Sequence, residues 1–129
     1  MNIRPYKHED FDTICSWWNT STNQVPPVGL MIEDGTFILE INKVPALCLT
    51  VLKTQSKEIC YLFGYVKNPS FNVLEEQGKK LWDHCFEYAK NSGYKRIMCI
   101  AHIDNLKLKY ERFGMTRTLN NVSTFSREL

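Results

Sequence analysis

Three strand-like segments joined by very short connections constrain the fold of this chain more than any other feature. The segments 36–41, 45–52 and 58–66 are rich in apolar and β-branched residues. Asn42-Lys43 lies between the first two, and Thr54 to Lys57 lies between the second and third. Connections this short admit only hairpins, so we expect three antiparallel neighbours in one sheet.

A helix and a further strand are predicted after the third segment. Asn68-Pro69-Ser70 ends that strand, and Gly93 marks the end of the following helix. The run 96–101 is predicted to be a buried strand, and a strand–helix–strand unit of this length places its two strands parallel. Helical spacing of three and four residues is shown by Leu74, Gly78, Leu81, Trp82, Cys85 and Ala89.

The two ends of the chain complete the predicted order. A short strand at Asn2 to Tyr6 leads into a helix, and Asn19 to Pro27 reads as a loop. A last helix begins at Asp104 or Asn105 and ends at Gly114, and residues 122–127 are predicted as an edge strand. The first helix is predicted from the spacing of Phe11, Ile14, Cys15 and Trp18.

The predicted fold class is therefore α/β (α+β), as one domain over residues 1–129. Its element order is β-α-β-β-β-α-β-α-β, with a mixed, mostly antiparallel sheet and one parallel crossover near the centre. The segment 60–66 is apolar almost throughout, so we expect a central strand that is covered on both faces.

Composition excludes several classes of partner. Sixteen Lys and Arg against 14 Asp and Glu give a net charge of +2, which argues against a nucleic-acid partner. No apolar run approaches the ~20 residues of a membrane span, and no signal peptide is apparent. We therefore expect a cytoplasmic protein without a membrane partner. No metal is expected, because zinc-ligand and redox-motif spacing is absent among Cys15, Cys48, Cys60, Cys85 and Cys99.

The segment 105–115 resembles the last helix of the GCN5-related N-acetyltransferase (GNAT) superfamily. That helix usually reads apolar, Tyr, Glu, Lys or Arg, any residue, Gly, Phe. The stretch 109–115 matches at Tyr110, Glu111, Arg112 and Gly114, with Met115 in place of Phe. A group of small acetyltransferase-like proteins from phages and bacteria is similar over nearly the whole chain, including Ile3-Arg4-Pro5, Glu9-Asp10, Trp17-Trp18, Tyr65 to Pro69 and Gly93 to Arg96.

The resemblance implies acetyl-CoA as co-substrate. In this fold a central strand bends at a bulge, and the pantetheine arm pairs with its exposed peptide groups. The pyrophosphate then lies on the N-terminus of the following helix. The residues that the resemblance assigns to the cofactor are Tyr65, Val66 and Lys67 on the strand, and Val73, Leu74 and Gly78 at the helix.

The resemblance also implies catalytic roles. Tyr110 is the candidate acid for the leaving thiolate, although an ordinary core tyrosine is the alternative. His102, at a strand end, is the candidate base or a solvated histidine; Tyr61 and Glu58 are weaker base candidates.

Tyr61 is also assigned to the substrate site, together with Trp17 and Trp18. Adjacent residues of a helix cannot share one face, so we expect at least one tryptophan in the core. The other then lines an acceptor pocket or binds a partner protein.

Two functions follow. The first is an N-acetyltransferase that moves an acetyl group to an amine of a small molecule or protein. The second is a catalytically degenerate GNAT-fold protein that acts as a protein-binding module. The second function is suggested by the pyrophosphate loop. There Val73 and Glu76 replace the family's Arg or Gln and first Gly, and only Gly78 is kept.

Overall fold

A computed structural model describes residues 1–22, 29, 31–99 and 111–115 of the chain. The chain divides into two compact units, Met1–Met98 and Cys99–Leu129. All labelled helices and strands belong to the first unit. The organisation of the whole chain as one domain stays a prediction.

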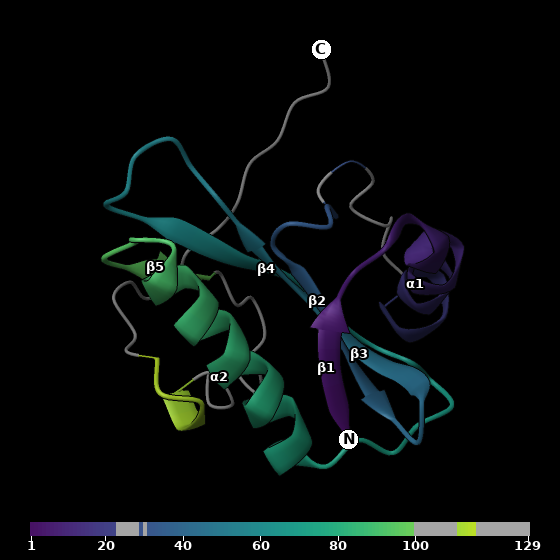
Figure 1. Ribbon diagram of the computed structural model, residues 1–129. Helices are drawn as coiled ribbons and strands as arrows, with labels where there is room; N and C mark the ends of the chain where they lie inside the picture. Colours follow the sequence, from purple (N-terminus) through teal and green to yellow (C-terminus); the bar gives the residue numbers. More distant parts are fainter. Residues whose placement is uncertain (23–28, 30, 100–110, 116–129) are drawn as a thin grey trace. The chain divides into compact units, whose positions relative to one another are not determined.

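The first unit is built on a five-stranded sheet, which is mixed and mostly antiparallel as predicted (Figure 1). The first four strands are antiparallel neighbours, and the fifth is parallel to the fourth. Asn42 and Lys43 both have positive φ, at 52° and 64°, as the twist of a tight hairpin requires. In sheet order the strands are β1 (Asn2–Pro5), β2 (Thr36–Ile41), β3 (Val44–Leu52), β4 (Cys60–Lys67) and β5 (Ile97–Met98).

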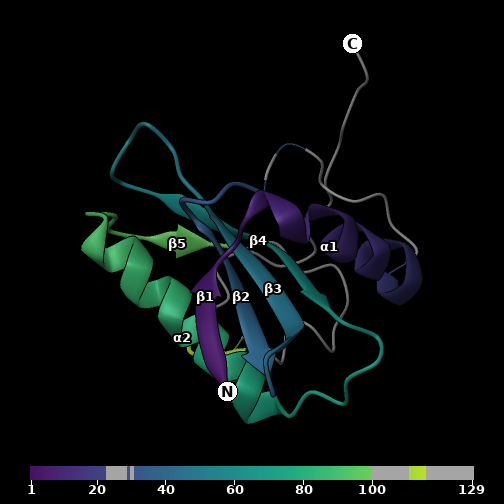
Figure 2. The same ribbon diagram turned by 45° about the vertical axis from the view of Figure 1, so that its right-hand side comes forward.

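Two helices cover opposite faces of this sheet (Figures 1 and 2). The first, α1 (Phe11–Trp17), follows a 3-10 turn at His8–Asp10 and continues into a π-helical turn, η2 (Trp18–Thr22). The second, α2 (Glu75–Asn91), connects β4 to β5. Phe37 of β2 packs edge-on against His84 and Tyr88 of α2, which places alternate β2 residues under each helix.

The apolar stripe predicted for α2 is confirmed from its second member onward. Gly78, Leu81, Trp82, Cys85 and Ala89 are all buried. Leu74 is instead exposed, because it stands just before the helix.

The ends of α2 are closed by hydrogen bonds. The amide of Leu74 donates to Oε1 of Gln77 at 2.9 Å. At the other end Gly93 has φ 92°, and the amide of Tyr94 donates to the carbonyl of Ala89 at 3.1 Å. The predicted stop at Gly93 is therefore confirmed.

The prediction that β4 is covered on both faces is wrong. Its side chains alternate between buried and exposed, and Tyr61 and Phe63 are exposed at 37% and 38%. The reason is that α1 and η2 reach only the Val66 end of the strand on their face of the sheet. The predicted strand 96–101 is found as β5 alone, and residues 100–101 lie outside the described part.

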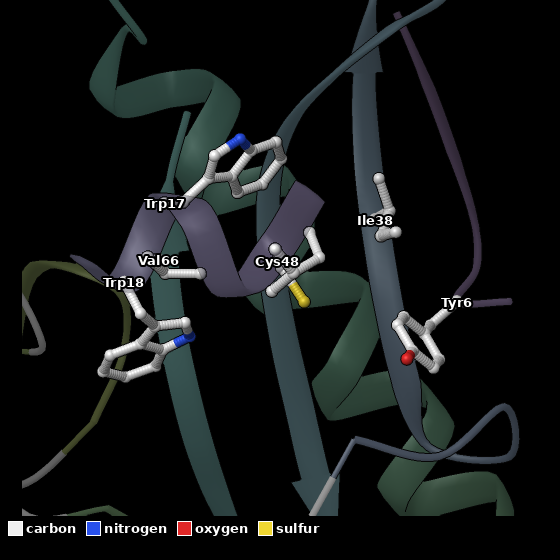
Figure 3. Packing of buried hydrophobic residues seen from close by; sticks show 7 residues of the cluster. Tyr6, Trp17, Trp18, Ile38, Cys48 and Val66 are labelled. Atoms are coloured by element: carbon white, nitrogen blue, oxygen red, sulfur yellow. The ribbon is translucent and has the colours of Figure 1, made fainter. Parts of the chain in front are cut away.

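Trp17 and Trp18 are both buried, so the prediction that at least one tryptophan lies in the core is confirmed, and neither is an exposed residue of a pocket (Figure 3). The two indole rings point away from each other while α1 lies across the sheet, which lets successive residues pack on either side of the helix axis. The predicted loop is π-helical at residues 19–22, and its remainder is not described. Both tryptophans belong to a cluster of buried residues between α1 and the sheet, which we call the core cluster. It consists of Tyr6, Ile14, Trp17, Trp18, Ile38, Cys48 and Val66.

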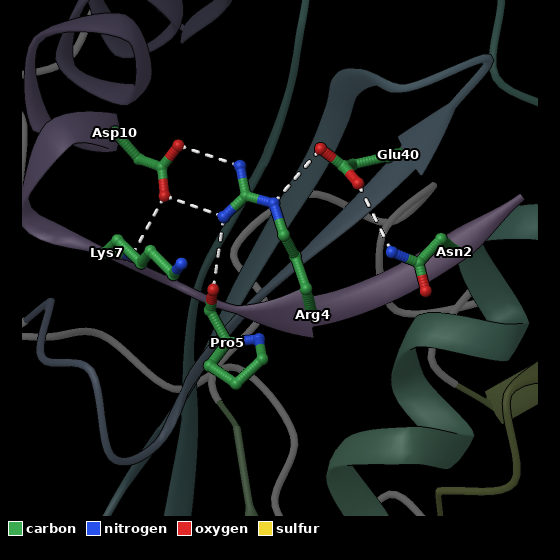
Figure 4. A network of polar contacts seen from close by, with 6 residues as sticks. All are labelled: Asn2, Arg4, Pro5, Lys7, Asp10 and Glu40. Atoms are coloured by element: carbon green, nitrogen blue, oxygen red, sulfur yellow. Dashed lines mark hydrogen bonds and ion pairs between the residues drawn. The ribbon is translucent and has the colours of Figure 1, made fainter.

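Arg4 joins β1, β2 and the start of α1 (Figure 4). Its guanidinium donates to both carboxylate oxygens of Asp10, at 2.8 and 2.9 Å, and to Glu40 at 3.0 Å. The Arg4 hydrogen bonds hold the pKa values of Asp10 and Glu40 below their usual range. Asp10 also accepts from the amide of Lys7 at 2.9 Å. This partly buried network fixes how the chain enters α1.

Two predicted elements fall largely outside the described residues. Glu111 and Arg112 are helical and Gly114 has φ 94°, but the rest of the last helix and the predicted edge strand are not described. Within the described part of the chain, no helix has the length and apolar character needed to span a bilayer.

We predict that Asp10→Asn lowers the free energy of unfolding by about 1.5–3 kcal/mol, because it removes a charged, bidentate partner of Arg4. The folded-state pKa of Asp10 is depressed, so its stabilisation is present at neutral pH and is lost as the pH falls below about 4. The free energy of unfolding of the variant should therefore fall less steeply than that of the wild type as the pH is lowered. Urea denaturation at several pH values measures this.

Asp83→Asn is the matched control, since it breaks the exposed Lys79–Asp83 pair on α2. It should cost less than about 0.5 kcal/mol. Equal losses in the two variants would contradict the structural role given to Arg4.

Candidate functional site

A bulge in β4 is the central feature of the candidate site. Val66 pairs with Cys48 of β3, and Phe63 pairs with Thr50. Gly64 and Tyr65 therefore stand opposite a single β3 residue. Gly64 has φ 72°, a conformation that glycine adopts without strain. A lone glycine inside an apolar strand is the sequence signal that marks this position.

From Leu62 onward, β4 presents an edge that β5 does not cover. The parallel pairs are Cys60↔Ile97 and Tyr61↔Met98. From Leu62 to Lys67, β4 has β3 on one side and, among the described residues, no strand on the other. We call this stretch the open edge.

Tyr65 and Lys67 direct their peptide groups toward the open edge. The amide of Asn68 donates to the carbonyl of Ala46 on β3 at 2.8 Å. Peptide groups alternate sides along a strand, so those of Val66 also point toward β3, and those of Tyr65 and Lys67 point away from it. The peptide groups of residues 65 and 67 therefore lie on the side of β4 that faces away from β3.

The beginning of the β4–β5 pair is fixed by Tyr94. Its hydroxyl donates to the carbonyl of Thr54 at 2.7 Å and accepts from the Thr54 amide at 3.1 Å. The amide of Cys60 also donates to the carbonyl of Arg96 at 3.0 Å. The β3–β4 connection and the α2–β5 turn are thus tied together at the closed end of the strand pair.

A short, pinned loop leads from the open edge to the N-terminus of α2. Nδ2 of Asn68 donates to the carbonyl of Pro45 at 3.0 Å, and its Oδ1 accepts from the amide of Ser70 at 2.9 Å. Nζ of Lys67 donates to the carbonyl of Phe71 at 3.0 Å. Because this loop is held, the first turn of α2 follows the open edge at a fixed place.

The other residues assigned to the cofactor lie just before α2 and near its N-terminus. Val73 is half-buried, Leu74 is exposed and Gly78 is buried against the sheet. Glu75 and Glu76 are exposed in the first turn of α2. First-turn amides and the helix dipole favour an anion here, whereas the two carboxylates oppose one.

The two faces of β4 differ at the bulge. On the α2 face, the Tyr65 ring packs edge-on against Trp82, with centroids 5.6 Å apart. On the α1 face, a Cβ built on Gly64 would lie 3.7 Å from Cζ2 of Trp18 and 3.9 Å from Oγ1 of Thr50. Trp18 therefore stands directly over the bulge, whereas Trp17 packs only within the core cluster.

The described cysteines are poor nucleophiles. Burial raises the pKa of Cys48 to about 12 and that of Cys99 to about 11, and it raises the pKa values of Cys60 and Cys85 as well. All five thiols are free. Among the described residues, no three His, Cys, Asp or Glu side chains form a group that would hold a metal ion.

Two predicted catalytic residues, His102 and Tyr110, lie outside the described residues, so their roles stay predictions. Tyr61 is described and lies on β4 before the bulge. Glu58 is exposed and ion-paired with Lys95 at 3.0 Å. Sequence reasoning did not single out Phe63, although its alternation with Leu62 in the same strand was a usable signal.

Comparison with known proteins shows that solved structures share the fold of this chain. No protein-family model matches the sequence, and no curated protein matches it significantly. Solved structures do match. The aminoglycoside antibiotic 6'-N-acetyltransferase AAC(6')-IG from Acinetobacter haemolyticus gives a TM-score of 0.69 at 17% identity, covering 100% of this chain and 99% of that chain.

Two further structures extend the likeness. Glucosamine-6-phosphate N-acetyltransferase from Arabidopsis thaliana gives a TM-score of 0.68 at 16% identity, covering 96% of this chain and 97% of that one. AAC(6')-Iy, in complex with the bisubstrate analogue CoA-S-monomethyl-acetylneamine, gives 0.73 at 14% identity, with coverage of 98% and 97%. The chain therefore has the fold of the GNAT superfamily, and the resemblance drawn from the sequence is confirmed at the level of the fold.

We predict that Gly64→Ala lowers the free energy of unfolding by about 1–2 kcal/mol, because alanine is strained at φ 72°. If acetyl-CoA binds along the open edge, as the resemblance implies, the same change should weaken its binding, because relief of the strain moves that edge. Urea denaturation and calorimetric titration with acetyl-CoA measure the two effects.

Gly93→Ala is the matched control, because Gly93 has a similar φ of 92° but lies at the C-terminus of α2. It should lose similar stability and keep its affinity for acetyl-CoA. Unchanged affinity in Gly64→Ala would show that the bulge has no part in the site.

Proposed function

We propose that the protein is an acetyl-CoA-dependent N-acetyltransferase that moves an acetyl group from the thioester to an amine. The observation that carries this proposal is the open edge of β4, which contains a bulge and leads through a short loop to the N-terminus of α2. The GNAT fold supports it, since acetyltransferases of that fold include one captured with a CoA bisubstrate analogue.

The proposed cofactor site uses the backbone more than side chains. The pantetheine amides pair with the peptide groups of Tyr65 and Lys67 as an added strand. The pyrophosphate lies at the first turn of α2, flanked by Val73 and Leu74. Gly78, one turn further on, lets the helix pack closely on the sheet.

The proposed reaction needs three groups. A base removes the proton of the acceptor amine, whose nitrogen attacks the thioester carbonyl carbon. A hydrogen-bond donor holds the carbonyl oxygen as negative charge develops on it. The C–S bond then breaks, and the departing thiolate takes a proton, for which Tyr110 is the proposed donor. His102 or a water chain serves as the proposed base.

We predict that Glu76→Gln tightens acetyl-CoA binding about fourfold. One like-charge contact at about 5 Å in a dielectric of about 80 costs roughly 0.8 kcal/mol. The gain should shrink in about 0.5 M salt, because exposed charges are then screened. Calorimetric titration of wild type and variant at two salt concentrations measures both effects.

Glu87→Gln is the control for Glu76→Gln, because it removes an exposed carboxylate from the same helix far from its N-terminus. It should leave the affinity unchanged. Absence of any heat or thermal shift in the wild type at millimolar acetyl-CoA would refute the transferase proposal and leave the protein-binding alternative.

A further inference from the structure

We infer that the acceptor is a single primary amine carried on an aromatic or apolar group, held on the α1 face of β4 by Tyr61, Phe63 and Trp18. The inference rests on the proposed function, because it assigns the acceptor side of that site. It names a substrate class that neither the fold nor the cofactor determines.

Strand pairing places Tyr61 and Phe63 on the α1 face. Phe63 pairs with Thr50, whose hydroxyl contacts that of Thr36 at 3.0 Å. Thr36 and Thr50 share the face of Ile38 and Cys48, because each lies two residues away on its own strand. Ile38 and Cys48 belong to the core cluster under α1. Tyr61 pairs with Leu52, two residues beyond Thr50, and so lies on the same face.

The two rings are accessible where the core cluster ends. At 37% and 38% exposure, Tyr61 and Phe63 are among the exposed large apolar residues of the described chain. Val66, beyond the bulge on the same face, is instead buried under α1. Trp18 stands over Gly64 between these two regions. The aromatic surface therefore runs from Tyr61 to the bulge, where the proposed thioester lies.

The acceptor reaches the thioester from this face. On the opposite face, α2 packs on the sheet and Trp82 lies against the Tyr65 ring. A nucleophile attacks a carbonyl carbon from above the plane of the carbonyl group, so it needs a face that no helix occupies. The α1 face before the bulge meets this requirement within the described first unit.

The described strand residues on this face carry no charge. The residues of β3 and β4 whose side chains lie on the α1 face are all uncharged. They are Ala46, Cys48, Thr50, Leu52, Tyr61, Phe63 and Val66. The carboxylates of Asp10 and Glu40, also on the α1 side, are both bonded to Arg4. A polyamine or aminoglycoside would find no carboxylate on these strands, whereas an aromatic amine would stack on the rings.

Calorimetric titration with amines, with and without CoA, tests the inference without requiring turnover. 2-Phenylethylamine represents the aromatic class, spermidine the polycations, and 2-aminoethanol the small polar amines. 2-Phenylethylamine should bind at least tenfold more tightly than either of the others. Tyr61→Ala and Phe63→Ala should each weaken its binding about five- to tenfold, because each removes one ring contact.

Val44→Ala is the matched control, since Val44 is 45% exposed at the start of β3. It should leave amine binding unchanged. Thermal melts of all variants separate lost binding from lost folding, and Phe63→Leu provides a second variant that keeps apolar volume without a ring and should still weaken binding.

The outcomes separate this inference from the proposed function. If acetyl-CoA fails to bind while 2-phenylethylamine binds and Phe63→Ala weakens it, the transferase proposal fails and the aromatic site stands. If acetyl-CoA binds but spermidine or 2-aminoethanol is preferred, or if no amine binds, the inference fails alone. Equal effects of Phe63→Ala and Val44→Ala also overturn it.

Discussion

The extra residue at Gly64 determines how the rest of β4 is used. Before the bulge, Tyr61 and Phe63 face α1; after it, Val66 faces α1 and Tyr65 faces α2. A strand of regular alternation would place residues 61, 63 and 65 on one face. The bulge shifts this pattern by one position, so that Tyr65 packs on Trp82 and Val66 enters the core. One glycine thus separates an accessible aromatic surface from a closed core.

Much of the fold was predictable because local constraints specify it. The two-residue connection at Asn42-Lys43 permits only a hairpin. The residues of the stripe from Gly78 to Ala89 are spaced by three and four, which predicts a helix. The error on β4 arises because alternation along a strand and packing of a helix both decide burial. The apolar run of β4 does not reveal which of its residues α1 leaves uncovered.

The candidate site was less predictable than the fold, for a physical reason. Its proposed cofactor contacts are peptide groups at Tyr65 and Lys67 and the first turn of α2, and every residue type supplies such groups. A sequence therefore marks these positions only through Gly64 and Gly78, where the backbone requires glycine or close packing. The resemblance around Tyr110 pointed to the GNAT fold, whereas the geometry of the bulge required coordinates.

The hydrogen bonds of Tyr94 to Thr54 have a mechanical consequence. They clamp β4 and β5 at one end, and the described pairing extends only to Tyr61 and Met98. The start of the parallel pair is therefore fixed by side-chain hydrogen bonds that lie outside the ladder itself. A change confined to Tyr94 would loosen the beginning of both strands at once.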